Sequence, residues 1–436
     1  MTVGWNQDVT STVGSVSMSV TVLARRWIAV LCLLAGIVAL FWAPDAKAQG
    51  GLTQRASNPI ALSGGRVIVS PDALPIDDAT VVIVDGRIRD VGLRGRVTVP
   101  AGATIIDCAG LVTVAGFQNS HVHFTEDKWT DAGAQPASKL TAQLRAMLTG
   151  YGFTTVVDTA SLLANTVAIR RRIGAGDVGG PRIITAGLAL YPPAGIPYYV
   201  KDVVPAELIR LLPQPQTVAA AAESVRANID GGADIIKLFT GSWVAPRQVL
   251  PMPISLASAA VAEAHRRRRL VFAHPSNVAG LEVALDAHVD VLAHAIDDVA
   301  GFTPGHLRRM SEAHVVLVPT LKLLATNGRR EVLDQVRDYA REGGRILFGT
   351  DVGYLPDYDP AREYQLLEAA GLTWRDILAS LTTEPAAVFA ESERRGRLAP
   401  GMDGDVVVLG TDLEVGSRAF TDVRYAIKAG RVIYQR

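Results

Sequence analysis

The chain has few cysteines and no excess of either charge. Of its 436 residues, 43 are basic and 43 are acidic. The chain therefore has no net positive charge that would attract nucleic acid or anionic lipid. Only two cysteines are present, and Cys32 lies in a segment that we expect to be removed, which leaves Cys108 alone and excludes an internal disulfide. These features favour a small-molecule substrate and argue against nucleic acid as a partner. Assembly into a homo-oligomer is compatible with this composition.

A long apolar run near the N-terminus predicts export. Two arginines precede the run at residues 27–42, and small residues follow it up to Ala48. This order is typical of a secretory signal peptide, so we expect residues 1–48 to be removed and the protein to be periplasmic or secreted, with no stable membrane partner. The alternative is a retained anchor, although the run is shorter than the about 20 residues that span a bilayer comfortably. A start at Met18 instead of Met1 leaves this prediction unchanged.

Both ends of the mature chain have the pattern of short strands and turns. Apolar runs at residues 66–69 and 81–84 are followed by Asp85-Gly86, a strong hairpin signal. Similar runs occupy residues 405–409 and 426–434. We therefore expect residues 49–115 and 391–436 to pair in one small β-sandwich domain.

The middle of the chain, residues 116–390, alternates apolar strands with helical stretches. Eight strands are expected, near residues 112–119, 154–158, 182–186, 234–238, 270–273, 289–293, 315–318 and 345–349. Eight strands with intervening helices over roughly 250 residues predict an α/β fold of the (β/α)8 TIM-type barrel class. A doubly wound open sheet is the alternative. The connections after the third and eighth strands are long and rich in proline and tyrosine, which is typical of functional loops.

Residues able to bind metal follow several of these strands, at the end of the barrel where catalytic groups gather. His121 and His123 end the first strand, and side-chain alternation puts both imidazoles on one face. His274 and His294 directly follow the fifth and sixth strands, and Asp351 follows the eighth. Each histidine alone could be an ordinary core or loop residue, and Asp351 could be a helix N-cap. Their shared position at one barrel mouth favours a metal site.

Lys237 lies inside the apolar fourth strand, where an unpaired ammonium would carry a heavy desolvation cost. Burial favours the neutral amine, which can add carbon dioxide to become a carbamate, and that anion can bridge two cations. The alternative is a salt-bridged or snorkelling lysine.

The order H-x-H, Lys, His, His, Asp across strands one, four, five, six and eight resembles the binuclear branch of the amidohydrolase superfamily, particularly its imidazolonepropionase-like and prolidase-like members. The resemblance covers nearly the whole mature chain and includes residues 232–237, 349–351 and 396–409. The family usually has Pro-Gly and then an acidic residue two positions before the first histidine. This chain has Ala115-Gly116 and Asn119, which puts the tuning of the ligands in question and leaves the ligands themselves in place.

The resemblance implies a binuclear metal centre. His121, His123 and Asp351 would hold one divalent ion and His274 and His294 the other. Carboxylated Lys237 and a hydroxide would bridge the two ions. Zinc is the default, although these ligands accept several metals.

The same resemblance implies a hydrolase. The bridging hydroxide would attack an amide, peptide, cyclic amide or lactone carbonyl, with Asp351 as base and then acid. A dipeptidase or prolidase-like activity is favoured, and substrate contacts are expected from Tyr191, Tyr198, Tyr199 and Lys322. The alternatives are a mononuclear imidazolonepropionase-like hydrolase of cyclic amides, or a deaminase. A non-catalytic binding protein is disfavoured because all six ligands are present.

Overall fold

The computed structural model describes residues 58–202, 206–325 and 329–436. The predicted signal peptide, residues 1–48, lies outside these ranges. No helix within the described ranges is both long and apolar enough to cross a membrane.

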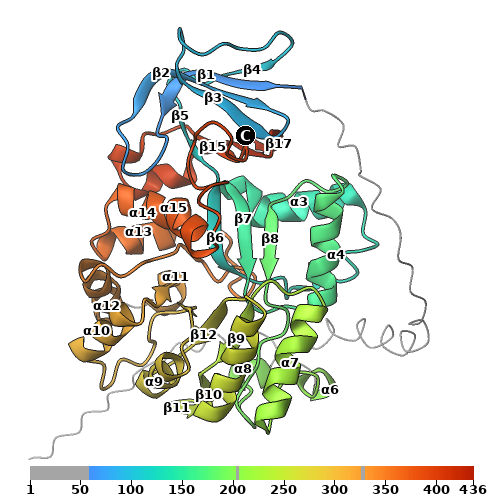
Figure 1. Cartoon of the computed structure of the whole chain (residues 1–436), viewed down its shortest axis with the longest axis vertical. Helices are drawn as coiled ribbons and strands as arrows, with labels where there is room; N and C mark the ends of the chain where they lie inside the picture. The colour runs from blue at the N-terminus through green and yellow to red at the C-terminus, as the bar shows by residue number, and fades with distance from the viewer. Residues whose placement is uncertain (1–57, 203–205, 326–328) are drawn as a thin grey trace, which may run out of the picture.

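The two ends of the chain meet in one eight-stranded sheet, at the top of Figure 1. Its central junction is the antiparallel pairing of β15 with β5, in which Val406 lies opposite Ala115. The strands follow the order β17-β16-β15-β5-β1-β2-β3, with β4 paired to β1. Their bounds are β1 Ile60–Val67, β2 Ile76–Val84, β3 Arg87–Leu93, β4 Thr104–Asp107, β5 Val112–Ala115, β15 Val406–Leu409, β16 Val423–Lys428 and β17 Arg431–Gln435.

The middle of the chain holds two parallel sheets. One has the order β6-β7-β8 and the other the order β14-β13-β12-β9. Three isolated parallel bridges link them in succession: Leu190 with Leu238, Leu317 with Ile346, and Val122 with Val352. The bounds are β6 Phe117–Val122, β7 Phe153–Asp158, β8 Arg182–Thr185, β9 Ile236–Phe239, β12 Val271–His274, β13 Val291–Leu292 and β14 Val316–Leu317.

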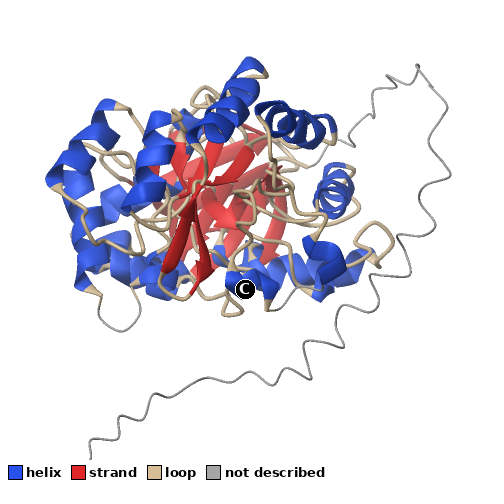
Figure 2. Ribbon diagram, turned by 90° about the horizontal axis from the view of Figure 1, so that it is seen from below, coloured by secondary structure: helices blue, strands red, loops and turns tan. Residues whose placement is uncertain are grey.

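Helices surround these parallel strands, as Figure 2 shows. The longer helices bury an apolar face: in α12, Val332, Val336 and Tyr339 are buried at the spacing of one helix face. The α-helices are α3 Ala137–Met147, α4 Leu163–Gly174, α5 Tyr198–Lys201, α6 Ala206–Ile209, α7 Val218–Asp230, α8 Ile254–Arg266, α9 Val278–Asp286, α10 Pro304–Glu312, α11 Leu321–Leu324, α12 Arg330–Arg341, α13 Ala361–Ala369, α14 Trp374–Leu381 and α15 Thr383–Val388. Short 3-10 helices are η1 Asp127–Trp129, η2 Thr149–Tyr151, η4 Leu413–Val415 and η5 Ser417–Thr421.

The prediction of a single first strand over residues 112–119 is wrong. The structure divides it at Gly116 into β5, which belongs to the terminal sheet, and β6, which belongs to the parallel one. A Cβ at position 116 would lie 2.3 Å from Thr154 Oγ1, so glycine permits the close approach at which the chain passes between the two sheets.

Two further differences concern strands near the mouth. The predicted eighth strand, residues 345–349, is reduced to a single bridge at Ile346. After β9 the chain forms an unexpected antiparallel hairpin of β10 (Gly241–Ala245) and β11 (Gln248–Pro251). Both strands of this hairpin are partly exposed, so their hydrophobic pattern does not mark them as strands in the sequence.

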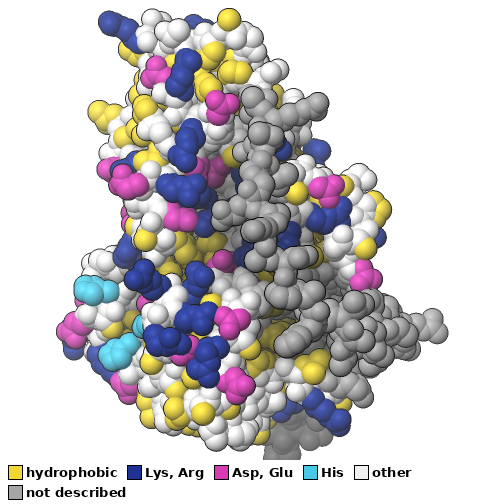
Figure 3. Space-filling model, turned by 45° about the vertical axis from the view of Figure 1, so that its right-hand side comes forward, with side chains coloured by type: hydrophobic (Ala, Val, Ile, Leu, Met, Phe, Trp, Pro, Cys, Tyr) yellow, Lys and Arg dark blue, Asp and Glu magenta, His cyan; other side chains and the backbone are white. Residues whose placement is uncertain are grey.

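Charged side chains of both signs are interspersed on the face shown in Figure 3. Many charged side chains of the described residues form ion pairs: Arg309 contacts both Glu282 and Asp286, and Arg267 contacts Asp230. The equal numbers of basic and acidic residues are therefore reflected in ion pairs between neighbouring side chains.

Candidate metal centre

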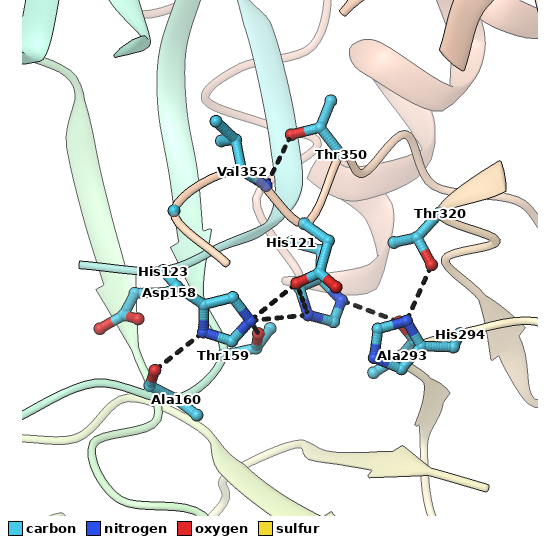
Figure 4. Close-up of polar contacts among 12 residues, drawn as sticks. His121, His123, Asp158, Thr159, Ala160, Ala293, His294, Thr320, Thr350 and Val352 are labelled. Carbon is cyan, nitrogen blue, oxygen red and sulfur yellow. Dashed lines mark hydrogen bonds and ion pairs between the residues drawn. The ribbon is translucent and has the colours of Figure 1, made fainter. Parts of the chain in front are cut away.

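Three predicted ligands converge at one point of the parallel strands (Figure 4). His121 is the penultimate residue of β6 and is fully buried, and His123 directly follows the strand. The Nε2 atoms of the two rings lie 3.2 Å apart. Asp351 Oδ1 lies 3.2 Å from His121 Nε2 and 2.8 Å from His123 Nε2, and the three ligand atoms fall within 4.8 Å of one another.

The hydrogen bonds of His121 and His123 leave their Nε2 atoms available to bind a cation. His121 Nδ1 lies 2.8 Å from the carbonyl oxygen of Ala293, and His123 Nδ1 lies 2.8 Å from that of Ala160. A carbonyl oxygen only accepts, so each Nδ1 donates, and in its neutral form each ring turns an Nε2 lone pair towards Asp351. Asp351 Oδ1 is itself buried without a hydrogen-bond donor. Three lone pairs that face one another in a buried site need a positive ion between them, so these residues fit a divalent metal.

Backbone contacts fix Asp351 beside β6. Its N–H donates to the carbonyl of His121 at 2.9 Å, and its φ of +57° is a conformation that few non-glycine residues adopt. Two residues earlier, a Cβ at Gly349 would lie 2.9 Å from the Cβ of His121. Asn119 Nδ2 donates to Thr350 Oγ1 at 2.8 Å, so the residue that departs from the family pattern still ties the histidine strand to the Asp351 segment.

The other two histidines continue the cluster. The ring centroid of His294 lies 4.5 Å from that of His121 and 4.4 Å from that of His274. Phe239, which sequence reasoning missed, stacks on His274 at 4.5 Å. The structure therefore brings all four predicted histidines together.

Lys237 lies on β9 with only 1% of its surface exposed. Its Nζ faces the ring of Phe239 at 5.8 Å, and within the described ranges no hydrogen bond or ion pair engages it. Burial lowers the pKa of this amine to about 7, although the negative charge of Asp351 opposes the shift. The snorkelling or salt-bridged alternative therefore does not hold, because the amine is neither exposed nor paired.

The four histidines do not share one electrostatic setting. For His123, burial acts to lower the pKa, yet the hydrogen bond to Asp351 and its charge raise that pKa above its usual value. The other three differ. Burial, the largest cause, lowers the pKa of His121 to about 4 and holds the pKa values of His274 and His294 well below the usual range, with the nearby amine of Lys237 adding to the effect. For Asp351, burial acts to raise the pKa, yet His121 and His123 together hold it well below its usual value. Neutral imidazoles beside an ionised carboxylate are the forms that bind divalent metals.

The predicted substrate contacts have different positions. Tyr191 is buried and stacks on Phe239 with a centroid distance of 4.5 Å, so it supports the His274 side of the cluster. Tyr199 contacts both Tyr198 and Tyr354, at 5.6 and 5.9 Å between centroids. Burial raises the pKa of Tyr354 to about 12, and the nearby charge of Asp351 contributes to the shift. Tyr354, three residues after Asp351 in the tyrosine-rich loop, is thus a further residue beside the site.

Lys322 is held within the protein. Its Nζ donates to the carbonyl oxygens of Asp357 and Asp359 at 2.8 and 2.7 Å and pairs with the Asp357 carboxylate at 2.9 Å. It therefore organises the loop that follows Asp351.

A family model, the amidohydrolase family, matches residues 112–433. The chain belongs to the amidohydrolase family. Its members are metal-dependent hydrolases of carbon–nitrogen bonds, so the chain is such an enzyme, as the sequence predicted. The range runs from β5 through the metal cluster to β17, so the family assignment covers every ligand described above.

Similar proteins include the ochratoxinase of Aspergillus niger, 25% identical over 407 residues, which are 82% of each chain. A dihydroorotase of Pelobacter propionicus is 30% identical over 137 residues, which are 29% of this chain and only 30% of that protein. Among solved structures, a Xaa-Pro dipeptidase with methionine bound in its active site has a TM-score of 0.73 at 20% identity, over 87% of this chain and 100% of that one. These similarities support a TIM-barrel-type α/β fold.

Proposed function

We propose that this chain is an exported amidohydrolase that uses two divalent metal ions to cleave an amide or peptide bond of a small molecule. The observation that carries the proposal is the convergence of His121 Nε2, His123 Nε2 and Asp351 Oδ1, with two more neutral histidines adjoining them.

The ligand assignment is the one that the family resemblance implies, and the cluster supports it. His121, His123 and Asp351 would hold one ion, and His274 and His294 the other. The neutral amine of Lys237 can add carbon dioxide and lose a proton, which gives an anionic carbamate suited to both ions. When bound, the ions would supply a water of lowered pKa and a Lewis acid for the scissile carbonyl. Zinc is the default because imidazole and carboxylate suit it.

The residues themselves perform the remaining steps. Asp351, ionised and fixed in place, would accept a proton from the attacking water and return it to the leaving nitrogen. The buried rings of Tyr191 and Phe239 exclude water from the side of His274. Tyr199 and Tyr354, which contact each other near Asp351, would contact the organic part of the substrate.

A peptide or N-acyl amino acid is the favoured substrate class. The names of the similar proteins, a Xaa-Pro dipeptidase and an ochratoxinase, support hydrolysis of such bonds. The second candidate is a mononuclear hydrolase of cyclic amides, or a deaminase. It is favoured by one observation: among the described residues, His121, His123 and Asp351 form the only group of three or more His, Cys, Asp or Glu side chains whose ligand atoms all lie within 4.8 Å of one another.

We also propose that the parallel strands close into a complete (β/α)8 barrel and that the terminal sheet forms a β-sandwich domain with boundaries near residues 115 and 391. Support comes from the three isolated bridges, which link the two parallel sheets and join the Ile346 segment to β14 and the Val352 segment to β6. The pairing of β5 with β15 supports a domain built from both chain ends.

The activity is tested with the purified protein loaded with zinc and bicarbonate. Dipeptides, N-acyl amino acids, lactones and cyclic amides are assayed, with Asp351→Asn as the control for contaminating hydrolases. Hydrolysis of a linear amide that Asp351→Asn loses supports the proposal. Turnover of cyclic amides alone would favour the second candidate.

Export is tested separately. N-terminal sequencing of the protein from the periplasm or medium is expected to begin at Gln49. A full-length chain retained in the membrane fraction would contradict the export proposal.

A further inference from the structure

A buried carboxyl group outside the metal cluster has no cationic partner. Glu363, near the start of α13, is fully buried, and within the described ranges no lysine, arginine or histidine forms an ion pair with it. Its Oε1 accepts the backbone N–H of Leu321 at 2.9 Å, and its Oε2 accepts that of Lys322 at 2.5 Å. Both oxygens are thus used to hold two consecutive peptide groups.

Those peptide groups directly follow a strained residue. Thr320 has a φ of +47°, in the left-handed region, which is unfavourable for a β-branched side chain. Such a conformation persists only where its surroundings enforce it. The two hydrogen bonds that Leu321 and Lys322 donate to Glu363 fix the chain immediately after Thr320 and so supply that enforcement.

The Thr320 hydroxyl then determines which ring nitrogen of His294 carries a proton. Thr320 Oγ1 donates its single proton to the carbonyl oxygen of Pro319 at 2.8 Å. The same oxygen lies 2.8 Å from His294 Nδ1, and towards that atom it can only accept. Figure 4 marks this contact with a dashed line. His294 therefore has its proton on Nδ1, and the lone pair of its Nε2 is free.

We propose that Glu363 is a positioning residue for His294: through Leu321 and Lys322 it fixes Thr320, whose hydroxyl selects the Nδ1-protonated form of His294 and leaves Nε2 to bind metal. The first part concerns the metal-free protein. Only the last clause rests on the proposed metal centre.

Imidazole ¹⁵N NMR of the metal-free protein tests the first part, with His294 assigned by His294→Gln. Glu363→Gln keeps the size of the side chain but turns an amide NH₂ towards one peptide N–H, and Thr320→Val removes the hydroxyl. Both variants are expected to lose the Nδ1-protonated pattern of His294, whereas Thr320→Ser is expected to keep it. Retention of the parent pattern in Glu363→Gln would overturn the proposal.

A matched control separates positioning from general destabilisation. Asp405 is also buried and also accepts a backbone N–H, that of Ala429 at 2.8 Å, but it lies in the terminal sheet region. Asp405→Asn is expected to lower stability while leaving the His294 signals unchanged. If Asp405→Asn alters those signals as strongly as Glu363→Gln does, the effect is general and the proposal fails.

Zinc titration tests the last clause. Loss of a residue that orients a metal-binding histidine typically lowers metal affinity about 10- to 100-fold. Glu363→Gln and Thr320→Val are each expected to weaken one zinc site by that amount, and the double variant is expected to be no weaker than the poorer single variant. Additive losses would show that the residues act separately. Fewer than two zinc ions in the parent would contradict the proposed function, and the NMR result on His294 would still decide the role of Glu363.

Discussion

His123 Nε2 lies 2.8 Å from Asp351 Oδ1, and the segments that carry these two residues are joined along their backbones. The N–H of His123 donates to the carbonyl of Val352 at 2.8 Å, and Thr125 Oγ1 donates to the carbonyl of Gly353 at 2.9 Å. The distance between the two ligands is therefore set by main-chain contacts, which makes the site rigid before any metal binds.

Gly353 is the point at which this contact is closest. A Cβ there would lie 1.9 Å from the carbonyl oxygen of His123, and its φ is +98°. Gly353→Ala is expected to displace His123 and lower zinc affinity at least about tenfold, because the ligands would no longer converge. The measurement is zinc titration combined with urea unfolding.

Gly401→Ala is the matched control, since Gly401 has a φ of +88° and nothing within 4 Å of its added Cβ. It is expected to cost about 1–2 kcal/mol from backbone strain alone and to leave zinc affinity unchanged. Equal zinc affinity in both variants would contradict the close-approach argument.

Replacement of Lys237 is expected to raise the free energy of unfolding of the metal-free protein while it lowers activity. Lys237→Met substitutes an apolar chain of similar length for a buried, unpaired amine, so the metal-free protein should become more stable by on the order of 1–3 kcal/mol. Activity and metal content should both fall. Urea unfolding of the metal-free proteins measures the first effect.

Lys128 provides the contrast, because its Nζ pairs with Glu126 at 2.7 Å and lies 4.0 Å from the ring centroid of Tyr358. Lys128→Met should destabilise the protein because Glu126 would lose its cationic partner and keep only the hydrogen bond from the Tyr358 hydroxyl. Destabilisation by Lys237→Met of the same size would show that the Lys237 amine has a partner after all.

Glu363 is expected to give stability a specific pH dependence. Burial, as the largest cause, raises its pKa from 4.5 to about 7; the nearby charge of Asp351 adds to the shift, and the N–H groups of Leu321 and Lys322 and the Lys322 charge oppose it. A raised pKa in the folded state contributes stability that is present below pH 4.5 and is lost as the pH rises through 7. The stability of the parent relative to Glu363→Gln should therefore fall by on the order of 3 kcal/mol across this window.

Urea unfolding of the metal-free proteins between pH 4.5 and 8 measures this difference. A difference that stays constant with pH would mean that the carboxyl group does not titrate there.

The residues proposed as metal ligands could be picked out in the sequence because each one follows an apolar strand or lies within it, as His274 and Lys237 do. The close approach of parallel strand ends then places them together. The residues that orient these side chains were harder to predict from the sequence. Phe239 and Glu363 act through ring stacking and through peptide N–H groups, and neither contact has a fixed spacing from its partner along the chain. The division of residues 112–119 at Gly116 was missed because both halves are buried and apolar, so periodicity alone shows no boundary.

Metal content per chain tests the central claim most directly. The purified protein and Lys237→Ala are each prepared with zinc and bicarbonate and analysed by plasma mass spectrometry. The binuclear account predicts about two ions in the parent and a clear loss in Lys237→Ala. One ion per chain in both proteins would contradict it and would favour a mononuclear enzyme held by His121, His123 and Asp351.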